Sequence, residues 1–380
     1  MARLGDICIV VSGSTPNTNI AEYWDGDIKW ITPAELDENS FYVMDSVRHL
    51  SEQGKSKAGL SLMPAGTVIL SSRAPIGKTA ITGCEMCCNQ GFKNLICTEK
   101  VYNEYLYFFL KGKTEYLNSL GRGATFKELS KSIVEDIEIP LPDYQTQKQI
   151  ALQMRKTEHL ILLRKQQLSK LNELVKARFV ELFGDFIEHT TPVDFESICE
   201  FVTVGIANSA THAFCDDGVI MFRNQNIKED YLDTSDIVHI TPDFANKYKS
   251  KMLKKDDLLI VRTGYPGVAC LVPEQYEGCQ TFTTLIARIK HGNAINPRFV
   301  CHYINSEYGK NYVRDNSAGA AQQNFGATAL SKLPICIPPI ELQGEYIRFV
   351  EQTDKSKLAI QKSLEKLETL KKALMQKYFG

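Results

Sequence analysis

The chain has 380 residues, 43 % of them apolar, which is enough for two domains with buried cores. Its formal net charge is −1, so a uniformly basic surface for nucleic acid is excluded, and any such contact must come from local basic faces. No segment approaches the length of a membrane span, and the first residues lack the pattern of a signal peptide.

The eleven cysteines are typical of a reducing compartment. Their number is odd, and most stand in apolar runs, as Cys8 and Cys270 do. Cysteine used in this way is a small apolar residue, so we expect a cytoplasmic protein. Cys84-x-x-Cys87-Cys88 has the spacing of half a zinc knuckle, but no second Cys or His pair follows it, so we predict no metal site.

In chain order, the first clear elements are two buried strands joined by a short turn. Residues 67–70 and 80–82 are apolar runs with the composition of strands. The turn between them ends in Gly77-Lys78-Thr79, which matches the tail of a phosphate-binding P-loop. The first glycine of that motif is replaced by Ser72, and a strand follows where a helix is required. We therefore predict a tight turn whose Arg73 lies against a sugar–phosphate backbone or enters a groove.

The next segments are a strand at 89–98 and an amphipathic helix at 103–120. A flexible loop follows, in which Arg122 and Lys127 add positive charge and glycines allow the backbone to approach a phosphate. We expect the apolar side chains of the helix to form core rather than a platform for stacked bases. The inward-facing residues are Tyr105, Phe108, Phe109 and Leu117.

Pro142–Gly184 predicts one long helix with a single apolar seam. Roughly 40 residues at 1.5 Å each give a rod on the order of 60 Å. A helix of this length needs a partner, in either a parallel or an antiparallel coiled coil. The predicted seam consists of Ile150, Met154, Ile161, Leu168, Leu171, Val175 and Leu182.

That partner is in the same chain, because the stretch returns after a shift of 196 residues as Pro338–Gly380. Residues 145–184 carry eight basic against three acidic side chains, whereas residues 341–380 carry eight against six. These charges also fit a solvated coiled-coil flank that contacts no ligand. The second seam consists of Tyr346, Val350, Ile360, Leu364, Leu367, Leu374 and Tyr378.

The globular part is duplicated as well, but less faithfully. Shifts of 190 or 191 residues pair Gly77 with Gly267 and the strand at 28–31 with the strand at 219–222. The second copy replaces the basic loop by the amide-rich run 317–324, which is equally typical of an ordinary linker. The candidate DNA-contacting residues of both copies are Arg73, Lys78, Lys93, Arg122, Lys127, Arg223, Asn224, Gln225, Arg262, Thr263, Gln322, Gln323 and Asn324.

No catalytic constellation is present in this pattern of residues. Three functions remain: DNA recognition, a non-DNA coiled-coil adaptor with two binding heads, and an NTPase that uses Gly77-Lys78-Thr79. An adaptor would lack salt-dependent affinity for duplex DNA. An NTPase would bind ATP without partners.

The duplicated order of globe and helix resembles the specificity subunit of type I restriction–modification systems. The second copy departs from the first at Leu342 and at Gly264-Tyr265-Pro266, which indicates a different reading surface. The residues that carry the resemblance are Ile139-Pro140-Leu141-Pro142 with Gln147 and Ile150, Ile335-Cys336-Ile337-Pro338-Pro339 with Gln343 and Ile347, Phe183-Gly184, Phe379-Gly380, Trp30-Ile31-Thr32 and Ala74-Pro75-Ile76-Gly77.

The resemblance implies an α+β fold with a pseudo-two-fold internal repeat. Two mixed α/β target recognition domains, 1–144 and 185–340, are each followed by a spacer helix, 145–184 and 341–380, and the helices pack antiparallel. Each domain is expected to read one half of a bipartite, asymmetric DNA site.

The chain itself is expected to be non-catalytic and to bind no cofactor. Two methyltransferase subunits would dock on it and use S-adenosylmethionine to methylate adenine N6. Restriction subunits would add ATP- and Mg-dependent translocation and cleavage of double-stranded DNA.

Overall fold

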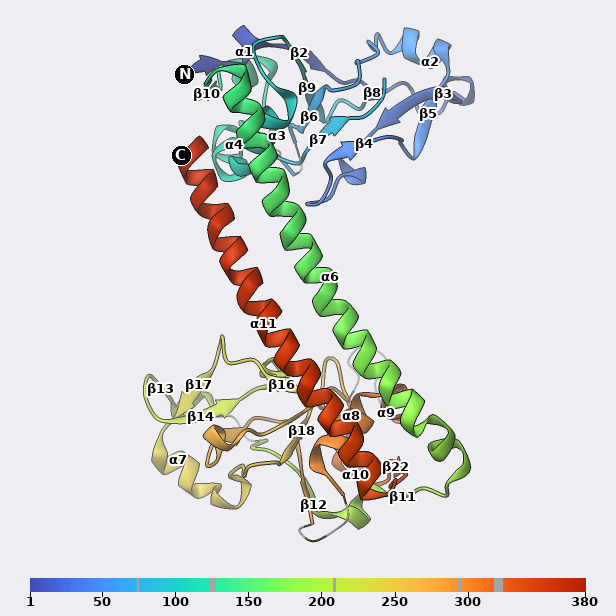
Figure 1. Cartoon of the computed structure of the whole chain (residues 1–380), viewed down its shortest axis with the longest axis vertical. Helices are drawn as coiled ribbons and strands as arrows, with labels where there is room; N and C mark the ends of the chain where they lie inside the picture. Colours follow the sequence, from blue (N-terminus) through green and yellow to red (C-terminus); the bar gives the residue numbers. More distant parts are fainter. Residues whose placement is uncertain (74, 124–126, 208–209, 291, 293–294, 318–323) are drawn as a thin grey trace. The chain divides into compact units, whose positions relative to one another are not determined.

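The computed structural model describes residues 1–380 apart from 74, 124–126, 208–209, 291, 293–294 and 318–323 (Figure 1). The chain divides into two compact units. Unit 1 comprises Met1–Gln166 and Gln361–Gly380, and unit 2 comprises Gln167–Ile360. Both units mix strands and helices, and each contains part of both long helices, so the predicted α+β repeat is confirmed.

Unit 1 is built on a five-stranded sheet of order β2-β9-β6-β7-β4 and a three-stranded sheet of order β5-β3-β8. Its first and last strands, β1 and β10, pair with each other and close the globe. The elements are β1 Ala2–Arg3, α1 Leu4–Ile7, β2 Cys8–Ser12, η1 Ala21–Tyr23, β3 Trp24–Ile31, η2 Pro33–Glu35, β4 Tyr42–Val43, β5 Arg48–Leu50, α2 Glu52–Lys57, β6 Val68–Ser71, β7 Thr79–Thr82, β8 Cys87–Cys88, β9 Phe92–Cys97, α3 Asn103–Gly112, α4 Thr114–Leu120, α5 Lys131–Glu135 and β10 Glu138–Ile139.

Unit 2 repeats this plan with sheets of order β12-β21-β18-β19 and β13-β17-β14-β20, and its closing pair is β11 with β22. The elements are β11 Val193–Asp194, η3 Phe195–Ile198, β12 Cys199–Val204, η4 Thr211–Ala213, β13 Phe214–Cys215, β14 Val219–Phe222, η5 Asn224–Asn226, β15 Ile227–Lys228, β16 Tyr231–Leu232, β17 Val238–Ile240, α7 Pro242–Lys247, η6 Lys249–Lys251, β18 Leu258–Ile260, β19 Ala269–Leu271, η7 Glu274–Tyr276, β20 Gln280–Thr281, β21 Leu285–Ile289, α8 Pro297–Asn305, α9 Glu307–Asp315, α10 Ala327–Ser331 and β22 Pro334–Ile335.

Sheet register fixes which residues of the two units correspond. Val68 lies opposite Leu95 in unit 1, and Leu258 lies opposite Ala287 in unit 2. The shift is therefore 190 residues at β6 and 192 residues at β9. The shift of 190 that matches Gly77 with Gly267 therefore does not extend to β9, because the connection before β9 is two residues shorter than its counterpart in unit 2.

The aromatic residues predicted as core are buried in unit 1. Tyr105, Phe108, Phe109 and Leu117 are at most 2 % exposed. The single helix predicted over 103–120 is instead two helices, α3 and α4, which meet at Lys113. The break turns the second helix so that Leu117 also reaches the core.

The long helices, α6 (Tyr144–His189) and α11 (Ile340–Phe379), begin after paired prolines and are held by equivalent buried glutamines. The Asp143 carboxylate accepts hydrogen bonds from the backbone N–H groups of the first turn of α6. Gln147 accepts from the N–H of Tyr102 and donates to the carbonyl of Pro142. Gln343 does the same with Asn296 and Pro338 in unit 2.

The prediction that Gly184 ends the first long helix is wrong. Helix α6 continues to His189, because Phe183 and Ile187 lie on the face that packs against the core of unit 2. The chain leaves the helix just before Pro192, which cannot continue it.

Within unit 1 the two long helices run antiparallel (green and red in Figure 1). Tyr378 donates to Gln153 at 3.0 Å, and Lys371 lies 2.6 Å from Glu158. In unit 2, Arg178 of α6 bonds Glu345 of α11 at 2.6 Å. All predicted seam residues are buried or half-buried. The buried seam also contains Thr157 and Thr353, which sequence periodicity missed and which are 196 residues apart.

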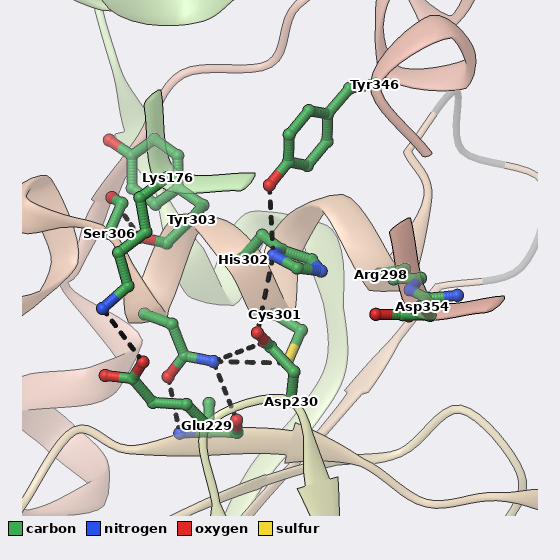
Figure 2. Close-up of polar contacts among 12 residues, drawn as sticks. Lys176, Glu229, Asp230, Arg298, Cys301, His302, Tyr303, Ser306, Tyr346 and Asp354 are labelled. Carbon is green, nitrogen blue, oxygen red and sulfur yellow. Dashed lines mark hydrogen bonds and ion pairs between the residues drawn. The ribbon is translucent and has the colours of Figure 1, made fainter. Parts of the chain in front are cut away.

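Unit 2 also contains a partly buried polar cluster around His302 of α8 (Figure 2). Asp230, in the turn between β15 and β16, accepts from Asn305 at 2.7 Å and lies 3.7 Å from His302. The hydroxyl of Tyr346, on α11, is 3.1 Å from Nδ1 of His302. Burial lowers the pKa of His302 despite the nearby carboxylate of Asp230. These contacts tie the hairpin turn, α8 and the long helix together.

Among the described residues, no helix has the length and apolar character needed to cross a membrane.

Candidate nucleic-acid interface

In each unit, the turn after a central strand pairs with the loop that precedes a short helix. In unit 1 the N–H of Leu129 donates to the carbonyl of Ser72 at 2.9 Å. In unit 2 the N–H of Phe325 donates to the carbonyl of Arg262, also at 2.9 Å. The two loop pairs are therefore equivalent, and they contain most of the candidate DNA-contacting residues.

The loop pair of unit 2 forms a connected polar surface. The Arg262 guanidinium donates through Nε to Oδ1 of Asn324 at 3.0 Å. Asn224 donates through Nδ2 to Oγ1 of Thr263 at 2.9 Å, and its Oδ1 accepts from Thr284 at 3.1 Å. Because both ends of the Asn224 side chain are held, Arg262 and Asn324 are better placed to present free donors and acceptors to a base edge.

Two further candidates share one acidic partner beside this surface. Arg223 lies 2.9 Å from the Asp236 carboxylate, and Gln225 donates to the same carboxylate at 2.6 Å. Asp236 neutralises Arg223 locally and orients Gln225, which is exposed. An amide held in this way can offer a defined hydrogen-bonding pattern to a groove.

In unit 1 the loop pair is basic rather than amide-rich. Arg73 and Arg122 each form a β-bridge with Glu128, and Arg122 and Glu128 exchange backbone hydrogen bonds of 3.1 and 2.9 Å. The side chains of Arg122 and Lys127 are exposed, and Arg73 is half-buried. This arrangement places three cations around one short loop.

Two residues of unit 1 that were predicted to contact DNA, Lys93 and Lys78, instead make contacts within the fold. Lys93 is 6 % exposed, and its ammonium lies 3.3 Å from the carboxylate of Glu128. The Lys78 ammonium donates to the carbonyls of Pro33 and Leu36 at 3.0 and 2.6 Å. Both lysines were predicted to contact DNA, but Lys93 is buried and the ammonium groups of both already have polar partners inside unit 1.

The contact of the Lys78 side chain with the backbone of the 3₁₀ turn η2 has an equivalent in unit 2. There the hydroxyl of Tyr265 donates to the carbonyl of Asn224 at 2.7 Å, and the sheet register matches Asn224 with Pro33. Both side chains fix a 3₁₀ turn, η2 or η5, to the neighbouring hairpin. The ring of Tyr265 is 43 % exposed and therefore also borders the reading surface. Gly264-Tyr265-Pro266 is also where the second copy departs from the first in sequence.

The paired loops also determine which candidate residues of the two units correspond. Arg73 and Arg262 are not equivalent, because the paired loops match Arg73 with Thr263 and Ser72 with Arg262. Gln322 and Gln323 lie outside the described residues. The carboxylate side chains of Glu128 and Asp236 were not predicted, and acidic residues beside a phosphate-binding surface leave no signal in a search for basic ones.

Comparison with known proteins identifies the family. A model of the type I restriction modification DNA specificity domain matches residues 1–173 and 191–372. The chain belongs to this DNA specificity family. The function of such a domain is sequence-specific recognition of DNA, and the alternative of a non-DNA adaptor has no support. The two matched ranges coincide with one copy of the duplicated globe and helix each.

Relatives of this specificity chain include subunits from an archaeon. It is 40 % identical over 197 residues to the type I restriction enzyme MjaIX specificity subunit of Methanocaldococcus jannaschii, a match that spans 51 % of this chain and 44 % of that relative. The MjaVIII specificity subunit of the same organism is 22 % identical over 99 % of this chain and 90 % of its own length.

Solved structures share the fold of the specificity chain. The type I restriction–modification S subunit of M. genitalium superposes with a TM-score of 0.59 at 12 % identity, covering 100 % of this chain and 95 % of that one. A chain from a study of the assembly and conformational transition of the type I R–M system superposes with a TM-score of 0.62 at 15 % identity, covering 100 % and 96 %.

Proposed function

We propose that this chain is the specificity subunit of a type I restriction–modification complex and that each unit reads one half of a bipartite DNA site. The observation that carries the proposal is the pair of equivalent loops with different side chains. Unit 1 presents Arg73 and Arg122 on its loop pair, whereas unit 2 presents Arg262 and Asn324 on the equivalent loop pair. One scaffold that holds two different sets of hydrogen-bonding groups suits an asymmetric target.

The long helices set the length of the unspecified gap between the half-sites in this proposal. Helix α6 has 46 residues and α11 has 40, and each continues through its unit boundary without a break. A continuous helix is a stiff element, so a change in its length changes the separation of the elements at its ends by about 1.5 Å per residue.

The same helices dock methyltransferase subunits. Apart from its buried seam, α6 carries four exposed leucines within unit 1, and three of them lie on one face. Leu152, Leu160 and Leu163 are 43 %, 44 % and 39 % exposed. Steps of 8 and 3 residues keep them within about 80° around the helix. An apolar stripe of this kind on a solvated helix supports a protein partner there.

In the assembled complex, the partners supply the chemistry. The methyltransferase subunits use S-adenosylmethionine to methylate adenine N6, and restriction subunits use ATP and Mg to translocate and cleave double-stranded DNA. The specificity chain itself contributes selection of the site and binds none of these cofactors.

The proposal is tested by long-read mapping of methylated adenine in the host and in a strain that lacks this gene. We expect one bipartite motif with a fixed gap to be methylated in the host and unmodified in the deletion strain. Restoring the gene should restore that motif. Retention of every methylated motif in the deletion strain, while the methyltransferase gene is expressed, would contradict the proposal.

A further inference from the structure

Two cysteines of unit 1 face each other across neighbouring strands. Cys8 is the first residue of β2 and Cys97 is the last of β9, and the antiparallel register places them directly opposite. The N–H of Thr98 donates to the carbonyl of Ile7 at 3.1 Å. The N–H of Cys8 donates to the carbonyl of Leu4 and not across the strands. Cys8 and Cys97 therefore form a non-hydrogen-bonded pair, in which opposing Cα atoms are about 4.5 Å apart and side chains come closest.

This pair has the geometry that a disulfide requires. Disulfides join cysteines whose Cα atoms are about 4.4–6.8 Å apart, a range that includes a non-hydrogen-bonded pair. Both residues are free thiols in this structure. A hydrogen bond with the Cys97 thiol, together with burial, raises the pKa of Cys8. The two sulfurs are thus already in contact, and a bond between them needs no large shift of either strand.

The two thiols differ in their access to solvent. Cys8 is 5 % exposed and belongs to the core of unit 1, whereas Cys97 is half-buried at the end of its strand. A small oxidant therefore reaches Cys97 first. An accessible thiol beside a second cysteine that can resolve the first product is the arrangement of redox-sensing pairs.

Unit 2 has only half of this arrangement. Its sheet register places Cys199 opposite Ile289. The N–H of Lys290 donates to the carbonyl of Ile198 at 2.9 Å, which matches the bond beside the pair in unit 1. The position is therefore structurally equivalent, but Cys199 faces an aliphatic side chain and has no thiol opposite it in the sheet.

We propose that Cys8 and Cys97 form a reversible disulfide with a low-molecular-weight disulfide, such as glutathione disulfide, as the oxidant, and that this bond locks β2 to β9 in unit 1 alone. This modification site goes beyond DNA recognition and does not depend on the proposed function. A disulfide in a reducing compartment is typically transient and redox-sensing, which agrees with the general use of cysteine in this chain.

The reaction is two successive thiol–disulfide exchanges. The Cys97 thiolate attacks one sulfur of the small disulfide, and the other sulfur leaves as a thiolate. The Cys8 thiolate then attacks the Cys97 sulfur of the mixed disulfide and releases the second small thiolate. The protons of the two cysteines pass to these leaving groups, so the cysteine pair loses two electrons and the small disulfide becomes two thiols.

The lock acts on an edge strand. Strand β2 is at the end of the five-stranded sheet, with β9 as its neighbour in that sheet. A bond between residues 8 and 97 also closes a long segment of the chain, which restricts the unfolded state and stabilises unit 1. Oxidation is therefore expected to raise the stability of unit 1.

The test uses the full chain, first reduced and then incubated with glutathione disulfide. Remaining thiols are blocked with N-ethylmaleimide, and the chain is digested with trypsin without reduction. Peptides 4–29 and 94–100 contain one cysteine each, and we expect them to be linked in most of the protein and separated by added thiol. The unfolding temperature should rise by at least about 5 °C on oxidation and return on reduction.

Three variants use the repeat as a control. Cys97→Ile gives unit 1 the pair that unit 2 has, and it should abolish both the linkage and the rise in unfolding temperature. The reverse change, Ile289→Cys, should add a second linkage between position 289 and Cys199. Cys215→Ser removes a half-buried cysteine that faces His239 across its sheet, and it should leave the linkage and the rise unchanged.

Three results would overturn the proposal. Alkylation of both Cys8 and Cys97 after oxidation would show that they are core thiols only. Glutathione retained on Cys97 would show that Cys8 does not resolve the mixed disulfide. Linkage without a rise in unfolding temperature would contradict the lock. Thermal unfolding of the reduced variants establishes that each is folded, and Ile289→Cys keeps the geometric argument testable if Cys97→Ile is not.

Discussion

At the scale of single residues, the two reading surfaces differ at one matched position of the paired loops. Glu128 in unit 1 accepts the buried ammonium of Lys93, whereas its counterpart Asn324 in unit 2 accepts from Arg262. In both units the contact ties a strand-side cation to the loop before a short helix. In unit 1 the cation, Lys93, is buried in the fold. In unit 2 the cation, Arg262, remains at the surface, so equivalent contacts leave different side chains available to DNA.

The first prediction concerns Arg262. Arg262→Ala should weaken binding of the specific duplex and lower the slope of log affinity against log salt by about one if the side chain contacts a phosphate. If the side chain reads a base, the loss should be about 1–3 kcal/mol and confined to one position of the site. Titration of labelled DNA by the assembled complex at several salt concentrations measures both quantities.

Lys255 provides the matched control for that titration. It stands before the opposite end of β18, about 23 Å along the chain from Arg262 at 3.3 Å per residue, and it pairs with Glu274 at the surface. Lys255→Ala should leave affinity and salt slope unchanged. An Arg262 variant that behaves like the Lys255 variant would remove Arg262 from the interface.

The second prediction concerns the buried histidine of unit 2 (Figure 2). Burial lowers the pKa of His302, so unfolded unit 2 binds more protons than folded unit 2 at mildly acidic pH. Its stability contribution should be complete above the unfolded pKa of about 6.5 and should fall as the pH decreases below that value. His302→Asn should reduce this loss between pH 7.5 and 5.5, measured as the change in unfolding temperature.

His212 serves as the comparison for this pH dependence. It lies on the surface of unit 2, and His212→Asn should leave the difference between the two pH values as it is in the wild type. An identical pH dependence in the His302 variant and the wild type would show that another group controls the acid sensitivity of unit 2.

At the scale of elements, the long helices were the most predictable part of the chain. Their apolar seam is a local, periodic pattern, so residues such as Ile150 and Leu364 can be assigned to it from their spacing alone. The end of α6 was not predictable in this way, because Phe183 and Ile187 extend the helix through contacts with distant parts of unit 2. The low helix propensity of Gly184 is outweighed by this tertiary packing.

The candidate site was less predictable, for a reason that is also physical. Lys78 bonds carbonyls 45 and 42 residues away, and Lys93 pairs with a carboxylate 35 residues away. A lysine next to a strand has the same sequence pattern whether its ammonium meets a phosphate or a buried carbonyl. The pairing of the loops follows the sequence repeat, since Glu128 and Asn324 are 196 residues apart, but the partners of each side chain depend on the fold of the whole unit.

The third prediction tests how the helices are anchored. Gln147→Leu should destabilise unit 1 by about 1–3 kcal/mol, since it leaves the buried N–H of Tyr102 and two backbone carbonyls without their partner. Urea denaturation followed by circular dichroism measures this loss. Gln145→Leu, two residues earlier and exposed, should change the free energy of unfolding by less than about 0.5 kcal/mol. Equal effects of the two substitutions would argue against the anchoring role of Gln147.

The fourth prediction tests the spacer. One heptad inserted between Gln166 and Gln167, with a second between Ile360 and Gln361, keeps the seam in register and lengthens the helix pair by about 10 Å. The gap in the methylated motif should grow by about three base pairs, and both half-sites should keep their letters. Mapping of methylated adenine reports the motif directly. An unchanged gap would contradict the proposal that helix length sets the gap between the half-sites.

At the scale of the whole molecule, the duplication explains how one chain can recognise an asymmetric site. Each globe opens and closes with a paired strand, β1 with β10 and β11 with β22. These pairs mark matching points, Ala2 with Ile139 and Val193 with Ile335, at which one globe can be exchanged for the other. Asymmetry in the DNA site then follows from the different loop residues, and the scaffold remains common to both halves.

The most direct test of this account is the methylated motif of a chain in which residues 193–335 are replaced by residues 2–139. The chimera, expressed with its methyltransferase subunits in a host that lacks other adenine methylation, is examined by long-read sequencing. We predict a symmetric motif in which the half-site read by unit 1 occurs twice, in inverted orientation, across an unchanged gap. Methylation of the original asymmetric site by the chimera would contradict the claim that each unit reads its own half.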